Sequence, residues 1–322
     1  TCSNVDSTNI PSQSDSSGSF SRCGSAGSSE SWWRESELPE ARQLRTHVEV
    51  DGSPDTSSLG WERPARAVLP EWPAVDDDLV ASGKRHLLTF DLDPTTLPTD
   101  ILCHLAMEMF VSAGLPAGLA EDRVRRFILA VRASMLDNPY HNFYHVVDVM
   151  QTTNALATST GTMARLDAWE RFALLSAALC HDMEHPGVTS QFLSKAAGHA
   201  TRGKYKDIIF RDALLEKHHA LSALKLMCDR DVGILEGLSS AQYYQFRSSV
   251  SKIILATDMN RHTQYFDQIQ EFAARRAEDP AVEMDKQLAM ELMVKCADIS
   301  NVVKPSAVAR RWALRVTDEF FV

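Results

Sequence analysis

The chain has 322 residues, a length that fits one large domain or two ordinary ones, and 44% of them are apolar, enough to build a sizeable core. Its formal net charge of -10 argues against nucleic acid as a partner, because no broad basic face is available to displace counterions. The longest apolar run, around residues 172–180, is about half the length needed to cross a bilayer, so we expect no membrane span in this chain.

Cysteine spacing bears on the compartment. The six cysteines lie far apart and form no Cys-x-x-Cys pair, which disfavours a disulfide framework and excludes a thiolate zinc ribbon. We therefore expect a cytoplasmic protein, with any membrane association supplied by regions outside this chain. Because the chain begins at Thr1 and not at methionine, we expect the natural N-terminus, with any targeting segment, to lie upstream.

Residues 1–80 differ in composition from the rest of the chain. Residues 1–31 consist mainly of Ser, Gly, Asn and Asp, and the text up to residue 80 stays rich in Pro, Ser and Asp. Such a segment buries too little apolar surface to offset the entropy of ordering, so we predict a disordered N-terminal segment over 1–80. Its isolated tryptophans leave open that it docks onto the domain or onto a protein partner. They are Trp32, Trp33, Trp61 and Trp72.

From about Lys84 onward, apolar residues recur at three- and four-residue spacing, separated by short Pro or Gly breaks. In chain order, the segments with this spacing are 101–111, 124–131, 146–150, 166–173, 214–226, 250–254 and 288–293. Period-two alternation is nearly absent, and no repeat of fixed period suggests a solenoid. The sequence therefore predicts a compact, multi-helix, all-α domain over residues 81–322.

Residues that can bind metal gather at the ends of these helices. His141 and His145 lie four apart, so they share a helix face and can point into one cleft, although such a pair by itself is more typical of surface or core. His181, Asp182 and His185 close the apolar run 172–180, where polar side chains are costly unless they are paired or bound to metal. This second group indicates a metal site.

Three further segments carry similar residues, each with a plainer alternative. Glu216 precedes two histidines and could belong to a solvated helix face. Asp298, like Thr257 and Asp258, follows an apolar helix and could simply cap it. Taken together, imidazole and carboxylate ligands without thiolate suit a zinc ion with open positions plus a harder ion such as Mg²⁺. Two such ions are a standard arrangement for hydrolysing phosphate esters.

The chain resembles the catalytic domain of the class I cyclic nucleotide phosphodiesterases, an HD-type metal phosphohydrolase fold, from about Leu87 to its end. The resemblance is carried by five motifs in the expected order, with further matches at Pro305, Trp312 and Glu319-Phe320-Phe321. The motifs are Tyr-His-Asn-x-x-His at 140–145, His-Asp-x-x-His-Pro-Gly at 181–187, Leu-Glu-x-His-His at 215–219, Ala-Thr-Asp-Met at 256–259, and Cys-Ala-Asp-Ile-Ser-Asn at 296–301.

The resemblance implies a role for each matching residue. The ligands of a tight, zinc-type ion would be His145, His181, Asp182 and Asp298. Asp182 would also bridge to a second ion, Mg²⁺ or Mn²⁺, whose waters would be oriented by His185, Glu216 and Thr257. The substrate pocket would include Tyr140, Met259, Ile299, Asn301 and Trp312. His141 would be the catalytic proton donor.

The implied activity is two-metal hydrolysis of cAMP, cGMP or both to nucleoside 5′-monophosphates, which ends cyclic nucleotide signalling. Two departures from the family pattern bear on it. Ser190 stands where the family usually has Asn, and the chain stops at Val322, before the helices that carry the purine-binding glutamine and an aromatic residue that stacks on the base. We therefore expect the chain to be a fragment whose nucleotide pocket is incomplete.

Three alternatives stay open at this point. The chain could be another HD-type phosphohydrolase that acts on dNTPs or linear nucleotides, although the segments 215–219 and 296–301 weigh against this. It could be a non-catalytic or regulatory member of the same fold, against which the intact His141 and four ligands speak. It could also serve as an interaction protein that recruits partners through its N-terminal segment, a function compatible with catalysis.

Overall fold

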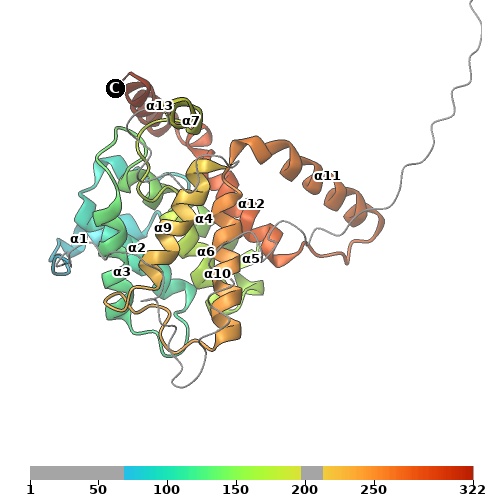
Figure 1. The fold of residues 1–322 in the computed structure, drawn as a ribbon, viewed down its shortest axis with the longest axis horizontal. Coiled ribbons are helices and arrows are strands. Elements are labelled where there is room, and N and C mark those ends of the chain that lie inside the picture. The colour runs from blue at the N-terminus through green and yellow to red at the C-terminus, as the bar shows by residue number, and fades with distance from the viewer. Residues whose placement is uncertain (1–68, 197–212, 322) are drawn as a thin grey trace, which may run out of the picture. The chain divides into compact units, whose positions relative to one another are not determined.

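The computed structural model describes residues 69–196 and 213–321 (Figure 1). Those two ranges contain helices and no strand, which confirms the predicted all-α fold class. The α-helices are α1 (Asp77–Lys84), α2 (Thr99–Ala113), α3 (Glu121–Ser134), α4 (Phe143–Ser159), α5 (Thr162–Arg165), α6 (Ala168–Cys180), α7 (Ser190–Ala196), α9 (Leu214–Met227), α10 (Ser240–Leu255), α11 (His262–Glu278), α12 (Lys286–Asp298) and α13 (Ser306–Phe320). Short 3₁₀ helices form at η2 (Pro94–Thr96), η3 (Met259–Arg261) and η4 (Ser300–Val303). None of the helices in these ranges combines the length and the apolar character that crossing a membrane requires.

Local sequence sets where the helices that carry the site begin. Asn142 caps α4 by accepting hydrogen bonds from the backbone N–H groups of Tyr144 and His145. Asp167 opens α6 in a capping box with Glu170, in which each side chain accepts a hydrogen bond from the other residue's backbone. These caps satisfy N–H groups that have no partner inside the helix, so each start is fixed within a residue or two.

Helix α6 lies in the core of the domain, where it packs against α4, α10, α9 and α2 (Figure 1). Its residues from Phe172 to Cys180 are all buried, as the apolar run predicts. Phe172 packs between Phe110 of α2 and Phe246 of α10, with ring centroids 5.0 and 6.1 Å away. Helix α12 packs across α4 and α10. The ends of α4, α6 and α12 therefore meet, and these ends carry the predicted ligands.

The expected boundary at residue 80 falls inside α1. Before that helix, Leu69, Trp72 and Val75 pack against the core of the domain. The Trp72 ring lies 4.9 Å from the ring of His104, whose Nε2 is 2.9 Å from the carbonyl oxygen of Pro73. One of the four tryptophans thus docks onto the domain. Residues 1–68, with the other three, lie outside the described residues, and the prediction for them remains a prediction.

Candidate metal and active site

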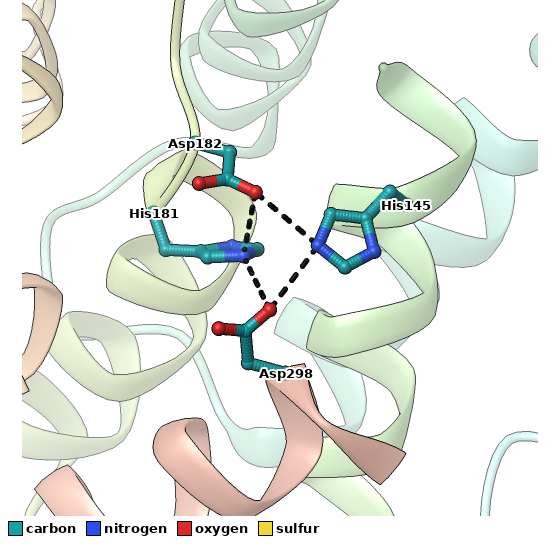
Figure 2. Close-up of side chains that lie close together, drawn as sticks. All are labelled: His145, His181, Asp182 and Asp298. Carbon is teal, nitrogen blue, oxygen red and sulfur yellow. Dashed lines mark hydrogen bonds and ion pairs between the residues drawn. The ribbon is translucent and has the colours of Figure 1, made fainter. Parts of the chain in front are cut away.

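Four side chains converge from three helices at one point (Figure 2). His145 stands in the first turn of α4, His181 is the C-cap of α6 with Asp182 directly after it, and Asp298 is the last residue of α12. Nδ1 of His181 lies 2.9 Å from the carbonyl oxygen of Ala178. Because a carbonyl oxygen can only accept, Nδ1 carries the hydrogen and donates it. Nε2 of His181 is therefore left to face the two carboxylates, as a ligand nitrogen must.

The spacing of these four groups fits a single metal ion. Nε2 of His145 lies 3.2 Å from Asp182 Oδ2 and 3.2 Å from Asp298 Oδ1. Nε2 of His181 lies 3.2 and 3.3 Å from the same two oxygens. Ligands placed about 2.1 Å from one ion are separated by roughly 3.0–3.4 Å in tetrahedral or octahedral geometry. Nε2 of His145 is buried and forms no regular hydrogen bond beyond these two ion-pair contacts, so a cation between the ligand atoms could replace its proton.

Charge is balanced inside this cluster by opposing effects. Burial lowers the pKa of His145 and His181, but the carboxylates of Asp182 and Asp298 outweigh burial and raise both above the usual histidine value. Burial conversely raises the pKa of each carboxyl, and the imidazoles hold it below the ordinary aspartate value. The cluster without metal therefore retains protons on its imidazoles, and a cation would take their place.

His141 lies beside the cluster and is held by Glu319 of α13. Its Nε2 is 3.9 Å from Asp182 Oδ2, and its side chain is 26% exposed, which leaves it accessible to a substrate. Glu319 Oε1 accepts from His141 Nδ1, while Oε2 accepts from the backbone N–H groups of Tyr140 at 2.8 Å and His141 at 2.9 Å. Burial raises the pKa of Glu319, but the bonds and charge of His141 prevail and lower it to about 2. Glu319 is thus an ionised carboxylate that orients the ring.

Glu319 had no predicted role from the sequence, apart from belonging to the segment Glu319-Phe320-Phe321 that matches the family. Its partner His141 is 178 residues away along the chain, and no local pattern relates the two. One feature of the sequence could have indicated that Glu319 is buried: it lies on the same helix as Val308 and Trp312, which are buried apolar residues. A buried carboxylate needs a partner, and the only way to identify that partner is to know how α13 packs.

The three residues predicted to orient waters of a second ion occupy different surroundings. Asp182, His185 and His219 bring ligand atoms within 4.8 Å of one another; His219 belongs to the predicted segment 215–219 but had been assigned no role of its own. Glu216 is half-buried, its Oε2 is enclosed without a hydrogen-bond partner, and burial raises its pKa to about 7. Thr257 is buried just after the end of α10, and its hydroxyl donates to the Ile254 carbonyl at 2.8 Å. This contact agrees with the alternative that Thr257 caps its own helix. Its predicted role toward water remains a prediction.

The predicted pocket residues fall into two groups. Tyr140, Asn301 and Trp312 pack together: Asn301 donates to the Tyr140 hydroxyl at 2.5 Å, and the Trp312 ring centroid lies 5.6 Å from that of Tyr140. The Tyr140 ring also lies 4.6 Å from His145, so this group forms a wall next to the metal cluster. Met259 and Ile299, in contrast, are 55% and 41% exposed and belong to η3 and to the turn before η4.

Comparisons with known proteins agree with this geometry. The family model for 3′5′-cyclic nucleotide phosphodiesterase matches residues 140–322. The 3′,5′-cyclic-nucleotide phosphodiesterase regA of Dictyostelium discoideum is 35% identical over 72% of this chain and 29% of its own length. The dual specificity calcium/calmodulin-dependent 3′,5′-cyclic nucleotide phosphodiesterase 1 of Drosophila melanogaster is 36% identical over 57% of this chain and 21% of its own. The chain thus spans under a third of either relative.

Among solved structures, the phosphodiesterase domain of the RhoPDE fusion protein from the choanoflagellate Salpingoeca rosetta superposes with a TM-score of 0.65 and 26% identity. The superposition covers 76% of this chain and 75% of that domain. The matched region of the family model begins at Tyr140 and so contains His141, all four residues of the metal cluster and Glu319. On these grounds the chain belongs to the 3′,5′-cyclic nucleotide phosphodiesterase family, whose members are metal-dependent.

Proposed function

We propose that this protein hydrolyses 3′,5′-cyclic nucleotides to nucleoside 5′-monophosphates. The observation that carries the proposal is an imidazole held by a carboxylate, His141 on Glu319, with its Nε2 only 3.9 Å from an oxygen of a four-ligand cluster. A proton donor beside a cation site suits cleavage of a phosphate ester, in which the leaving oxygen needs a proton. The names of the relatives support the cyclic nucleotide as substrate.

The donor set favours zinc at the tight site, because two imidazole nitrogens and two carboxylate oxygens suit it and no thiolate takes part. Asp182 would bridge to a second ion, Mg²⁺ or Mn²⁺, with His185, Glu216 and Thr257 orienting its waters. When bound, such ions supply positive charge to the phosphate oxygens and lower the pKa of water. That supply of charge is what an acidic chain needs in order to bind an anionic substrate.

The chain's own residues perform the proton chemistry. Glu319 accepts the hydrogen on Nδ1 of His141, which leaves Nε2 as the ring nitrogen that faces Asp182, where a proton for transfer would be carried. From there His141 would protonate the ribose 3′ oxygen as its bond to phosphorus breaks. Tyr140, Asn301 and Trp312 would form one side of the pocket beside the reacting phosphate.

An assay of the purified chain with Zn²⁺ and Mg²⁺ on cAMP, cGMP and dNTPs tests the proposal. We expect 5′-monophosphate products from a cyclic nucleotide, and a loss of about 10²–10⁴-fold in turnover for His141→Ala at unchanged metal content. Turnover of dNTPs without hydrolysis of either cyclic nucleotide would refute it in favour of another phosphohydrolase. Absence of bound metal after loading would instead indicate a non-catalytic member of the fold.

We further propose that the catalytic domain includes the segment from Leu69 onward, which packs against its core, and that the protein acts in the cytoplasm to end cyclic nucleotide signals. Four cysteines in the described ranges are free thiols, as a reducing compartment requires, and two of them, Cys103 and Cys180, are buried. Fractionation of cells that express the tagged protein tests this placement. Recovery in an oxidising compartment such as the secretory pathway would contradict it.

A further inference from the structure

The Asn138 side chain connects two loops of the site. It lies in the loop before α4, and its Nδ2 donates one hydrogen bond to the carbonyl of His141 at 3.0 Å and one to the carbonyl of His185 at 2.8 Å. A primary amide has two hydrogens, and both are used here. Since the two acceptors belong to the segments that carry the proton donor and the metal-binding His-Asp motif, one side chain fixes these segments relative to each other.

The two histidines whose carbonyls Asn138 binds also stack on each other. The ring centroids of His141 and His185 are 3.8 Å apart, and the ring planes differ by 18°. The His185 ring is fixed from its other end, because its Nδ1 accepts a 3.1 Å hydrogen bond from the backbone N–H of Gly187. His185 therefore presents a stationary face to His141, and the stack persists only while the two backbones keep their separation.

Gly187 provides a second, independent indication of the same arrangement. Its φ is +73°, a conformation that favours glycine, and a Cβ atom at this position would lie 2.9 Å from Oδ1 of Asn138. The amide thus uses its nitrogen to bind both loops and places its oxygen where a side chain at position 187 would otherwise stand. On the opposite side, Asn142 donates to the carbonyl of Asn138 at 2.7 Å, which anchors the loop to the cap of α4.

We propose that Asn138 is a positioning residue for the proton donor. By clamping the 138–142 loop to the 181–187 loop, it holds the His141 ring stacked on His185 while Glu319 holds its Nδ1. The ring is thereby restrained from two directions, and Nε2 stays beside the metal cluster. This inference rests on the proposed role of His141, because a clamp on the ring has catalytic meaning only if the ring transfers a proton.

The effect should fall on the chemical step. The Asn138 side chain bonds to two backbone carbonyls and to none of the four cluster residues, so its loss should leave the metal site occupied. Misplacing a reacting group by about 1 Å can cost roughly 100-fold in rate. We therefore expect kcat to fall by about 10- to 100-fold in Asn138→Ala, with KM changed by less than about threefold.

Two substitutions and a matched control test this clamp in the full chain loaded with zinc. Asn138→Ala removes the amide, and Asn138→Asp keeps its shape but removes both N–H donors. The control is Gln151→Ala. It removes an amide on α4 that also donates to backbone carbonyls, those of His86, Leu87 and Thr89, away from the site. The control should lose stability and keep kcat, whereas both Asn138 variants should lose kcat at unchanged zinc content.

A readout independent of activity is the NMR spectrum of the histidine rings. Stacked rings shift each other's protons upfield, so the ring protons of His141 and His185 should lose that shift in both Asn138 variants and keep it in Gln151→Ala. Gly187→Ala completes the test. If its added methyl group acts by displacing Asn138, then Asn138→Ala/Gly187→Ala should have a kcat no lower than that of Asn138→Ala alone.

The possible outcomes distinguish a failure of the proposed function from a failure of the proposed role of Asn138. If the unsubstituted chain hydrolyses no cyclic nucleotide, the proposed function fails, while the ring shifts still test the clamp. An unchanged kcat with unchanged ring shifts in Asn138→Asp would overturn the positioning role. So would a fall in kcat that merely follows loss of zinc, or one that Gln151→Ala reproduces at equal stability.

Discussion

Replacing Glu319 by glutamine tests how this site holds the proposed proton donor, His141. The substitution keeps the shape of the side chain and removes its charge. In the native chain the two carboxylate oxygens accept three hydrogen bonds, two from backbone N–H groups and one from His141 Nδ1. Glutamine has one acceptor oxygen. If that oxygen keeps the backbone bonds, the amide N–H₂ faces Nδ1, which then loses its acceptor.

The size of the effect follows from the bond that is lost. A hydrogen bond to a charged group contributes about 1.5–3 kcal/mol, and each 1.36 kcal/mol in activation free energy changes a rate tenfold. If the whole contribution acts at the step in which the proton is transferred, kcat of Glu319→Gln should fall by roughly 10- to 150-fold. The metal bound by the four-residue cluster should not change, because Glu319 is not among those four residues.

Steady-state hydrolysis of a cyclic nucleotide by Glu319→Gln, His141→Ala and the double variant is the assay. Because Glu319 is inferred to act only through the His141 ring, the double variant should be no slower than His141→Ala alone. A Glu319→Gln chain with native kcat would refute the reasoning. Independent, multiplicative losses in the double variant would refute it as well, since they would show that Glu319 contributes without the ring.

Three further predictions concern metal binding and stability. Asp298→Ala removes one of the four proposed ligands, so bound zinc, measured by elemental analysis after dialysis, should fall in this variant and not in His141→Ala. Equal zinc in both variants would contradict their separate roles. Lys304 and Asp148 form an ion pair whose side chains are 0% and 3% exposed. Lys304→Met should therefore lower the free energy of unfolding, measured in urea, by about 3–5 kcal/mol, and adding Asp148→Leu should recover most of that loss. Native stability of Lys304→Met would contradict the burial of the pair. In the metal-free chain, the pKa values of His145 and His181 are raised by folding, so protonation of these rings stabilises the folded state. This contribution to the free energy of unfolding is complete below the ordinary histidine pKa of about 6.5 and is lost as the pH rises through the raised pKa values. Its thermal midpoint should therefore fall above about pH 7, and a rise there would refute the assignment.

Much of the fold and of the metal cluster can be predicted from the sequence. Apolar residues at helical spacing identified the helical segments, and the buried run from Phe172 to Cys180 became the central helix α6. The polar residues that follow it, His181 and Asp182, stood out because such groups are costly at the end of a buried helix. The helices and the buried run could be predicted because helical period and burial follow from neighbouring residues, and the candidate ligands could be proposed because their chemistry is a property of the residue type.

Other parts of the site depend on contacts that sequence spacing does not encode. Asp298 and Thr257 both follow apolar helices, and both allowed the same reading as helix caps. The structure distinguishes them, because Asp298 lies 3.2 Å from His145 whereas the Thr257 hydroxyl donates to its own helix. Which of the two reaches the cluster depends on how α12 and α10 pack against α4 and α6.

The sequence by itself predicted the helical class and the residue types that could bind metal, and its resemblance to the phosphodiesterases implied His141 as the candidate proton donor. Only the tertiary structure showed what holds that donor in place. Glu319 reaches it from 178 residues away, and Asn138 binds it to His185 through two backbone carbonyls. Backbone acceptors are the same at every residue, and a carboxylate can serve any donor that packing brings to it. Which pair forms is therefore a consequence of how the helices pack.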